Sequence, residues 1–282
     1  MDAEHVSAVQ RRLLGWYAEH GRDLPWRKTS DPYAILVSEV MLQQTQVDRV
    51  IPRWYAWLAR FPTLVDLARA SRADAIRAWQ GLGYNLRAVR LHGIATQCVA
   101  EHSGELPRTL DGLLRLKGVG RYTAGAVACF AFGLPATMVD TNVRRVLSRV
   151  FSASPEEVDG LAVAVLPADN AYAWNQALMD LGSTTCRAAR PLCLVCPLLD
   201  VCAAPGASSR VKPAAGNAAF AGSSRYFRGR ILDALRTLPD GRGASVDELA
   251  RAVASERERV LPLLERMTRD GLVNQNGDSY TL

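Results

Sequence analysis

The chain has 282 residues, of which 49% are apolar, so it can bury a sizeable core in one large domain or in two. Its net charge of +6 favours a polyanionic partner, with nucleic acid first, although a basic balance alone is weak evidence. The N-terminal segment lacks an apolar signal core, and no apolar run reaches about 18 residues. We therefore expect a cytoplasmic protein without membrane contact, in which the six cysteines are metal ligands or buried thiols before they are disulfides.

Residues 5–203 predict a near-continuous series of helices, because apolar residues recur at helical spacing and no stretch alternates with period two. Pro and Gly separate the helical segments. Asp31-Pro32 is typical of an N-cap followed by proline in the first turn, and it opens the helix that carries Glu39. The clearest helical segments are 33–47, 73–79, 122–132 and 143–150.

Residues 204–222 are rich in Ala, Gly, Ser and Pro and predict a linker. Beyond it the sequence predicts three helices and two short strands joined by a turn. These elements fall at 226–235, 246–253, 257–269, 271–274 and 277–282. Three helices and a terminal hairpin suggest a winged-helix-like domain over residues 223–282.

Two acidic residues are candidates for chemistry, and each also has a simpler interpretation. Glu39 lies among apolar residues, where desolvation would raise its pKa and suit it to general acid catalysis. Periodicity alone favours a Glu on the solvated face of that helix. Asp140 follows a loop and opens a helix, where the simplest interpretation is an N-cap.

The segment Gly118-Val-Gly120 joins two helical segments in a tight connection, for which glycine tolerates positive φ. The free N–H groups at the start of the second helix, flanked by Lys117 and Arg121, would form an anion site that grips a DNA phosphate. An ordinary Gly-rich turn fits the connection equally well. The cysteine cluster that follows favours the helix-hairpin-helix interpretation.

Four cysteines lie within 17 residues in the pattern C-x6-C-x2-C-x5-C. Their thiolates suit zinc or a [4Fe–4S] cluster. The single x2 spacing differs from the paired knuckles of zinc ribbons, and the wide first gap suits a cubane, so iron–sulfur is favoured over zinc and over unrelated cysteines. The four are Cys186, Cys193, Cys196 and Cys202. Cys98 and Cys129 lie in apolar helical contexts and are expected to be core thiols.

Five sequence segments and the cysteine cluster, in this order, resemble the MutY-type adenine DNA glycosylases of the helix-hairpin-helix superfamily, which also includes endonuclease III. The segments are SEVMLQQTQV (38–47), GLGYN (81–85), LKGVGRYTAGAV (116–127), VDTNVRRVL (139–147) and NQALMDLG (175–182). The resemblance implies a mainly α, two-module glycosylase domain over residues 1–203. One module, a six-helix barrel, would span about 23–134, and the cluster module would combine 1–22 with 135–203.

The resemblance also implies catalytic roles. Glu39 would be the general acid that protonates adenine at N7, and Asp140 the carboxylate that stabilises the oxocarbenium ion of the deoxyribose. Tyr122 and Asn142 would line the pocket and position these groups. Relatives with strong strand-cutting activity carry lysine in place of Tyr122, and that amine forms a Schiff base with the sugar. The tyrosine therefore predicts a monofunctional glycosylase.

Further residues match positions that contact DNA in the family. Gln44 and Tyr84 would wedge into the base stack where the adenine leaves it, and so offset part of the cost of base flipping. Arg27 would lie at the edge of the pocket. The remaining DNA-binding residues are Gln43, Thr45, Lys117, Gly118, Gly120, Arg121 and Arg144.

Two departures from the family pattern bear on function. Asn85 stands where the family commonly has a second tyrosine. The C-terminus lacks the Nudix-like domain that reads oxidised guanine in many members, so a preference for 8-oxoguanine over guanine opposite the adenine stays open. The winged-helix-like domain, with Arg225, Arg228 and Arg230 at its start, would add phosphate contacts or serve as a docking module.

The resemblance thus predicts a monomeric enzyme that excises adenine opposite guanine or 8-oxoguanine from double-stranded DNA containing a mispair. The first alternative is the same scaffold acting on thymine or uracil opposite guanine. The second, of another class, is a non-catalytic iron–sulfur DNA-binding sensor, which would not need both Glu39 and Asp140.

Overall fold

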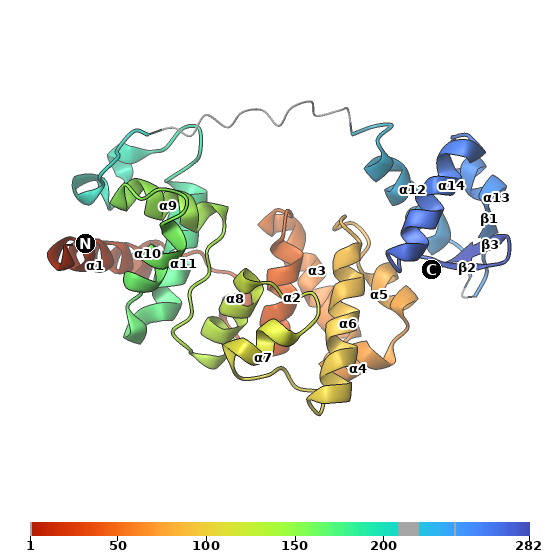
Figure 1. Ribbon diagram of the computed structural model, residues 1–282, viewed down its shortest axis with the longest axis horizontal. Helices are drawn as coiled ribbons and strands as arrows, with labels where there is room; N and C mark the ends of the chain where they lie inside the picture. The colour runs from red at the N-terminus through yellow and green to blue at the C-terminus, as the bar shows by residue number, and fades with distance from the viewer. Residues whose placement is uncertain (1, 208–219, 240) are drawn as a thin grey trace. The chain divides into compact units, whose positions relative to one another are not determined.

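The structure is a computed structural model that describes residues 2–207, 220–239 and 241–282 (Figure 1). The described residues are mainly helical, which confirms the expected fold class. They form two compact units, each built from three stretches of chain. Of the described residues, the first unit draws on 2–39, 106–115 and 119–207, and the second on 40–105, 116–118 and the described residues from 220 onward. Of the linker expected at 204–222, residues 208–219 lie outside the described part of the chain.

The first unit is a set of helices arranged around α11, which packs against α1, α8 and α9. Its helices are α1 (Ala3–His20), α2 (Pro32–Leu42), α7 (Leu110–Arg115), α8 (Arg121–Phe132), α9 (Thr141–Phe151), α10 (Val158–Ala164) and α11 (Ala171–Thr184). Single 3-10 turns lie at η1 (Pro25–Arg27), η2 (Ala168–Asn170), η3 (Cys193–Val195) and η4 (Leu199–Val201). The last three residues of α2 belong to the second unit.

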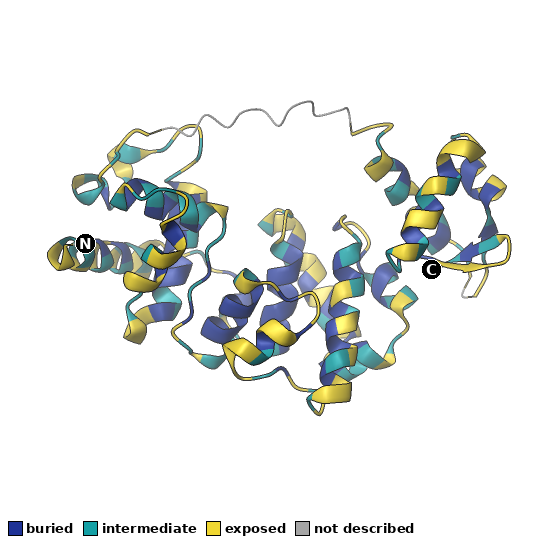
Figure 2. Ribbon diagram, viewed as in Figure 1, coloured by how far each residue is buried: buried dark blue, intermediate teal, exposed yellow. Residues whose placement is uncertain are grey.

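Apolar burial holds the first unit together. One cluster unites buried residues of α1, α9, α10 and α11, among them Leu13, Leu147 and Trp174, and the cysteine loop packs against it. Helices α2 and α8 are buried over most of their length, as Figure 2 shows. An all-round apolar helix can only be an interior helix. A polar side chain carried on α2 is therefore held inside the protein.

The second unit contains helices α3 to α6 and the C-terminal region. Helix α6 packs against α4 and α5, and α3 packs against α5. These helices are α3 (Val47–Arg60), α4 (Leu64–Arg69), α5 (Arg72–Ala78) and α6 (Leu86–Glu101). The helical run expected over 33–47 is broken after Leu42, where Gln44 adopts a positive φ of 58°. That prediction was wrong because the helical spacing of apolar residues continues to Val47, whereas the backbone leaves the helix at a turn after Leu42.

The C-terminal region has three helices and a small antiparallel sheet. Its elements are α12 (Ser224–Arg236), β1 (Ala244–Ser245), α13 (Val246–Ala252), α14 (Arg257–Arg269), β2 (Asn274–Asn276) and β3 (Ser279–Thr281). The strand order β1-β3-β2 places the C-terminal strand in the middle of the sheet. The three helices and the second strand agree with the sequence prediction, but the first strand begins at Asn274, where the prediction had it end, because residues 271–273 form a turn. The two-residue β1 is too short to leave an alternating pattern.

No helix in the described residues is long and apolar enough to cross a membrane.

Candidate active site

Glu39 lies in the interior of the first unit, on helix α2. Asp31 accepts a hydrogen bond from the backbone N–H of Tyr33 at 3.0 Å and so organises the first turn of the helix. Glu39 is only 3% exposed, which rules out the solvated-face interpretation. Among the described residues, its Oε2 has no hydrogen-bond partner. A buried carboxylate with one unpartnered oxygen is costly in its charged form and can present a proton to a ligand.

The surroundings of Glu39 change its acidity. Burial raises the pKa of Glu39 to about 7, and the nearby charge of Asp140 acts in the same direction. A hydrogen bond with the Tyr122 hydroxyl and the charge of Arg27 act against this rise. A carboxyl group with a pKa near 7 is partly protonated at neutral pH, as a general acid must be.

Asp140 is the N-cap of helix α9. Its Oδ1 accepts hydrogen bonds from the backbone N–H groups of Asn142 at 2.9 Å and Val143 at 2.7 Å. Its Oδ2 accepts a bond from the Asn142 side-chain amide at 2.9 Å. The N-cap interpretation is therefore correct. It is compatible with a second role, because N–H donors at a helix N-terminus stabilise a carboxylate in its charged form.

Two glycines allow the backbone near Asp140 to approach its neighbours closely. A Cβ on Gly125 of α8 would meet the carbonyl oxygen of Thr137 at 2.2 Å. A Cβ on Gly182 of α11 would meet the Cβ of Asn142 at 2.7 Å. Both distances are too short for any side chain. The position of the segment that carries Asp140 therefore requires glycine at these two sites, one on α8 and one on α11.

Tyr122, in the first turn of α8, is close to both carboxylates. Burial raises its pKa well above the usual value, and the charges of Glu39 and Asp140 add to the rise. Its hydroxyl also donates to the sulfur of Met179 at 3.8 Å. Because the charge of Asp140 raises the pKa values of both Glu39 and Tyr122, and Glu39 also raises that of Tyr122, the three groups lie within electrostatic range in one site.

Arg27, expected at the pocket edge, is held by a partner that sequence reasoning missed. Its Nη1 donates to Oδ2 of Asp180 at 2.9 Å and its Nη2 to Oδ1 at 2.7 Å. Arg22 donates to the same carboxylate through its backbone N–H and its Nε. The Arg27 side chain is 7% exposed. Asp180 falls within the NQALMDLG segment, so the motif included this residue but did not indicate that it pairs with Arg27.

Arg145 is a second missed residue. Its Nη2 donates to Asn142 Oδ1 at 2.7 Å and to the carbonyl oxygen of Gly182 at 2.6 Å. Its Nε donates to the carbonyl oxygen of Cys186 at 2.7 Å. One guanidinium thus joins the Asp140–Asn142 pair to the start of the cysteine loop.

The predicted hairpin is the connection between α7 and α8. Gly118 has a φ of +96°, a conformation that favours glycine, and Gly120 is the N-cap of α8 without a side-chain cap. The backbone N–H of Lys117 donates to Gln97 at 2.9 Å, and Arg121 is exposed at the first position of α8. The uncapped start of α8 keeps the geometry of an anion site.

The predicted DNA-contacting loops of the second unit depend on Arg87, which sequence reasoning also missed. Its buried guanidinium donates to carbonyl oxygens on both loops, among them those of Gln43 at 2.6 Å and Gly83 at 3.1 Å, and to Thr45 Oγ1 at 3.0 Å. Burial lowers the pKa of Arg87 to about 10. Arg87 thus holds the loop 43–45 against the loop that ends in Tyr84.

Arg144, expected to bind DNA, lies on helix α9. It donates to Asp159 at 2.7 Å and to the carbonyl oxygen of Pro155 at 2.8 Å. Its position is therefore fixed by contacts with the start of α10 and the turn before it.

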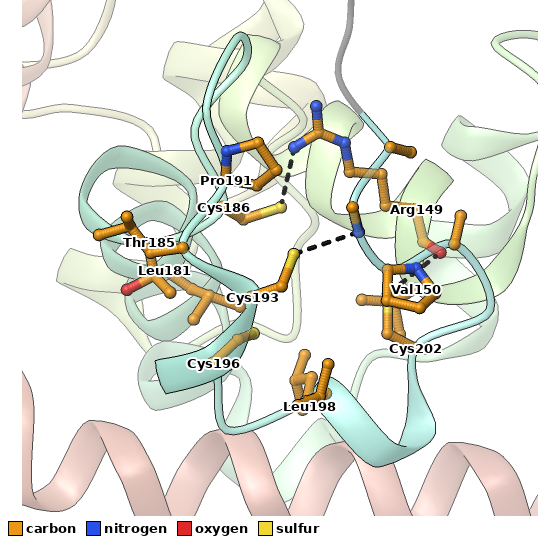
Figure 3. Close-up of a pocket in the computed structure, with 16 residues that line it drawn as sticks. Arg149, Val150, Leu181, Thr185, Cys186, Pro191, Cys193, Cys196, Leu198 and Cys202 are labelled. Carbon is orange, nitrogen blue, oxygen red and sulfur yellow. Dashed lines mark hydrogen bonds between the residues drawn. The ribbon is translucent and has the colours of Figure 1, made fainter.

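The four clustered cysteines line a single pocket, together with Arg149 and Leu198 (Figure 3). None of the four forms a disulfide. Arg149 Nη1 donates to Cys186 Sγ at 3.4 Å, and the backbone N–H of Gly206 donates to Cys193 Sγ at 3.2 Å. Cys98 and Cys129 are buried, as expected of core thiols.

The chemistry of this pocket fits an iron–sulfur cluster, although the four thiols are not arranged as a ready metal site. Within the described residues, no group of three or more His, Cys, Asp or Glu side chains is close enough to hold a single ion. The pocket wall is otherwise mostly apolar, and two of the sulfur atoms accept N–H donors. Four thiols around a mostly apolar space, with N–H donors to two of the sulfur atoms, are a donor set that fits an iron–sulfur cluster.

Comparison with known proteins defines the relatives of the chain. Residues 37–162 match the model of a family described as HhH-GPD superfamily base excision DNA repair protein. The adenine DNA glycosylase of Mycolicibacterium smegmatis is 42% identical over 283 residues, covering 97% of this chain and 94% of that protein. The human adenine DNA glycosylase is 44% identical over 220 residues, covering 72% of this chain and 40% of that protein.

Solved structures agree with these relatives at the level of the fold. A thermostable thymine-DNA glycosylase has 30% sequence identity and a TM-score of 0.67, and the match covers 71% of this chain and 95% of that one. A trapped endonuclease III–DNA covalent intermediate has 24% identity and a TM-score of 0.63 over 72% of this chain and 96% of that one, which shows the fold alone. The helix-hairpin-helix glycosylase fold expected from the sequence is confirmed.

Proposed function

The chain belongs to the adenine DNA glycosylases of the HhH-GPD superfamily, and from this membership we propose that it excises adenine mispaired with guanine or 8-oxoguanine in base excision repair. The observation that carries the proposal is Glu39, a buried carboxyl group with a pKa of about 7 and one unpartnered oxygen, beside Asp140. A non-catalytic DNA-binding protein has no need for this arrangement. The enzyme is proposed to act as a monomer on double-stranded DNA.

The proposed reaction begins with acid catalysis. Protonated Glu39 donates its proton to N7 of the extruded adenine. The base can then leave as neutral adenine instead of as an anion, which is a poor leaving group. The bond between C1′ and the base then breaks, and its electron pair leaves with adenine. Positive charge develops on the deoxyribose as an oxocarbenium ion. Water adds at C1′ and loses a proton, for which the Glu39 carboxylate is an available acceptor, and an abasic site results.

Asp140 is proposed to stabilise the oxocarbenium ion. Two backbone N–H groups at the start of α9 and the Asn142 amide stabilise its carboxylate as an anion and fix its direction. A preorganised anion offsets developing positive charge without reorganising during the reaction. Tyr122 is proposed to hold the Glu39 carboxyl group in place. Because a tyrosine hydroxyl cannot form a Schiff base, we propose a monofunctional glycosylase with little lyase activity.

DNA is proposed to bind through two kinds of contact. The uncapped N-terminus of α8, with Lys117 and Arg121, would grip a backbone phosphate. Gln44 and Tyr84 would enter the base stack, with Gln43 and Thr45 beside them. Both Gln44 and Tyr84 adopt a positive φ, at 58° and 45°, a conformation that is uncommon for residues other than glycine.

The four clustered cysteines are proposed to hold a [4Fe–4S] cluster. The group would supply structural support by fixing the loop that runs from Cys186 to Cys202, with its exposed arginines, for contact with DNA phosphates. Arg149 and the backbone N–H of Gly206 would donate hydrogen bonds to the cysteine sulfurs.

A panel of duplexes tests the proposal. Adenine opposite guanine and opposite 8-oxoguanine, and thymine and uracil opposite guanine, would each be incubated with the protein and analysed with and without alkaline treatment. We expect abasic product from the adenine duplexes, and strand cleavage only after alkali. Because a thymine-DNA glycosylase shares the fold, product from the thymine duplex alone would overturn the choice of base.

Two substitutions separate catalysis from binding. Glu39→Gln and Asp140→Asn should remove excision while binding to the mispair survives. An iron–sulfur DNA-binding sensor would show no turnover in the unmodified protein and unchanged binding in both variants.

A further inference from the structure

Helix α12 of the C-terminal region is anchored to the loop that carries the proposed wedge residue Tyr84. Arg236, at the end of α12, donates to Asn85 Oδ1 at 2.8 Å and to the carbonyl oxygen of Ile76 at 3.0 Å. Its side chain is 7% exposed and also pairs with Asp233 at 2.7 Å. A buried guanidinium that is bound on both sides fixes α12 relative to this loop.

The contact with Arg236 accounts for Asn85, the residue of this loop that departs from the expected family pattern. Asn85 stands where related sequences were expected to carry a second tyrosine, and its amide oxygen is the acceptor for Arg236. Asn85 and the C-terminal region therefore form one structural feature.

Arg225, at the other end of α12, contacts Tyr84 directly. Its Nη1 donates to the Tyr84 hydroxyl at 2.8 Å, and its guanidinium lies over the Tyr84 ring at 5.4 Å from the centroid. The guanidinium of Arg87 lies over the same ring at 5.6 Å. Tyr84 is nonetheless 45% exposed. Two cations thus hold the ring of a residue that still faces solvent.

Positive charge gathers around this loop. Arg49 of α3 donates to the carbonyl oxygen of Gly81, and the guanidinium of Arg53 lies against Gly81. Arg225 donates to a hydroxyl. These contacts are to neutral groups, so they leave the positive charges of the arginines available to an anion. A duplex whose stack is opened by Tyr84 carries phosphates on both sides of the opening.

We infer that helix α12 is part of the DNA-binding surface, and that Arg225 contacts a backbone phosphate beside the base pair that Tyr84 enters while it holds Tyr84 in position. The inference rests on the proposed function, because it requires that Tyr84 meets DNA. It assigns the C-terminal region to the recognition of the opened duplex, through contacts that do not read sequence.

The first experiment measures DNA affinity at several salt concentrations, using a duplex with an A:G mispair and the full-length protein. Arg225→Ala should lower the affinity several-fold and reduce the slope of log K against log salt by about 1, as expected for one lost phosphate contact. Arg251→Ala is the matched control, because it removes another exposed arginine, from α13 of the same region. Unchanged binding by Arg225→Ala, or an equal loss in Arg251→Ala, would overturn the inference.

The second experiment tests the positioning of Tyr84. Tyr84→Phe removes only the hydroxyl that Arg225 binds, and 2-aminopurine in place of the target adenine reports extrusion of the base. If Arg225 positions Tyr84, the single variants should each weaken extrusion, and the double variant should add little to Arg225→Ala. Fully additive effects would contradict the positioning role.

Excision of adenine by the unmodified protein is measured in parallel. If that protein binds DNA but excises nothing, the proposed function fails while the salt slope still reports on Arg225. If it excises adenine and Arg225→Ala keeps the unmodified slope, the inference alone fails.

Discussion

Arg27 and Asp180 form a two-bond ion pair in the interior of the first unit. The Asp180 side chain is fully buried and also receives the backbone N–H and Nε of Arg22. Burial opposes the charge on Asp180, but the hydrogen bonds from Arg27 and Arg22 outweigh it and hold its pKa below the usual value. The pair ties the segment before α2 to helix α11. It also keeps the Arg27 charge near Glu39, whose pKa it lowers.

Removing the Asp180 charge should therefore destabilise the protein strongly. Asp180→Asn leaves two arginines without their buried counter-ion, and breaking a buried pair from one side costs roughly 3–5 kcal/mol. Denaturant unfolding of both proteins at pH 7 measures the change. Asp200→Asn is the matched control, because its pair with Arg12 is exposed and worth at most about 1 kcal/mol. Equal stability of the two variants would show that the pair at Asp180 is unimportant.

Adenine excision should fall as the pH rises through neutrality. As the proposed general acid, Glu39 must be protonated to donate, and burial raises its pKa to about 7, so the single-turnover rate should be highest below pH 7 and drop tenfold per pH unit well above it. Rates measured between pH 5 and pH 9, with DNA binding followed separately, check this. A rate that stays flat to pH 9 would remove Glu39 as the acid.

The raised pKa of Glu39 should also make the stability of the protein depend on pH. The pKa of Glu39 is raised by burial from 4.5 to about 7, so the folded state holds its proton more tightly than the unfolded state. This contribution is complete below pH 4.5 and is lost as the pH rises through 7. Glu39→Gln cannot ionise and lacks this loss. Its free energy of unfolding should therefore rise, relative to that of the unmodified protein, by up to about 3 kcal/mol between pH 5 and pH 8. Equal pH dependence of unfolding in the two proteins would contradict the assignment.

The sequence was sufficient to predict features that short motifs encode. Helical spacing and Pro/Gly punctuation located seven of the fourteen α-helices in the described residues, and the Gly118-Val-Gly120 turn has a positive φ at Gly118, as glycine permits. The spacing of the cysteines indicated a common site, and they line one pocket. Each of these features depends on residues that are near one another in the chain.

Features that depend on distant pairs could not be predicted. Asp180 lies 153 positions from Arg27, and Arg236 lies 151 positions from Asn85. No local pattern distinguishes a buried arginine from an exposed one, so nothing in the sequence marked Arg87 of α6 as the residue that holds two loops together. Glu39 shows the same limit, because periodicity favoured the solvated face and only the all-round burial of α2 decided the question.

Substitution of a clustered cysteine should remove the proposed iron–sulfur cluster. Cys196→Ser replaces one of the four pocket thiols, and we expect loss of the absorbance near 400 nm and of bound iron, together with reduced stability. Cys98→Ser is the control, because Cys98 is a core thiol outside that pocket and its loss should leave the iron content unchanged. Colourless, zinc-loaded unmodified protein would contradict the identity of the metal.

The close approach of Gly125 to Thr137 predicts opposite effects for two glycine-to-alanine changes in helices. Gly125→Ala would force the segment before Asp140 away from α8, because its Cβ cannot lie 2.2 Å from a carbonyl oxygen. Overpacking of this kind costs typically 1–3 kcal/mol. Gly93→Ala, in α6, has nothing within 4 Å of its Cβ and should stabilise the helix by up to about 1 kcal/mol.

Excision separates the two variants further. A shift of about 1 Å in a catalytic group can cost roughly 100-fold in rate, so Gly125→Ala should lose excision beyond what its reduced folded fraction explains, while Gly93→Ala should keep it. Thermal unfolding and single-turnover rates at a temperature where both variants are folded make the comparison. A normal rate in folded Gly125→Ala would mean that Asp140 keeps its place without the contact, and that the approach of α8 to this segment does not position the carboxylate.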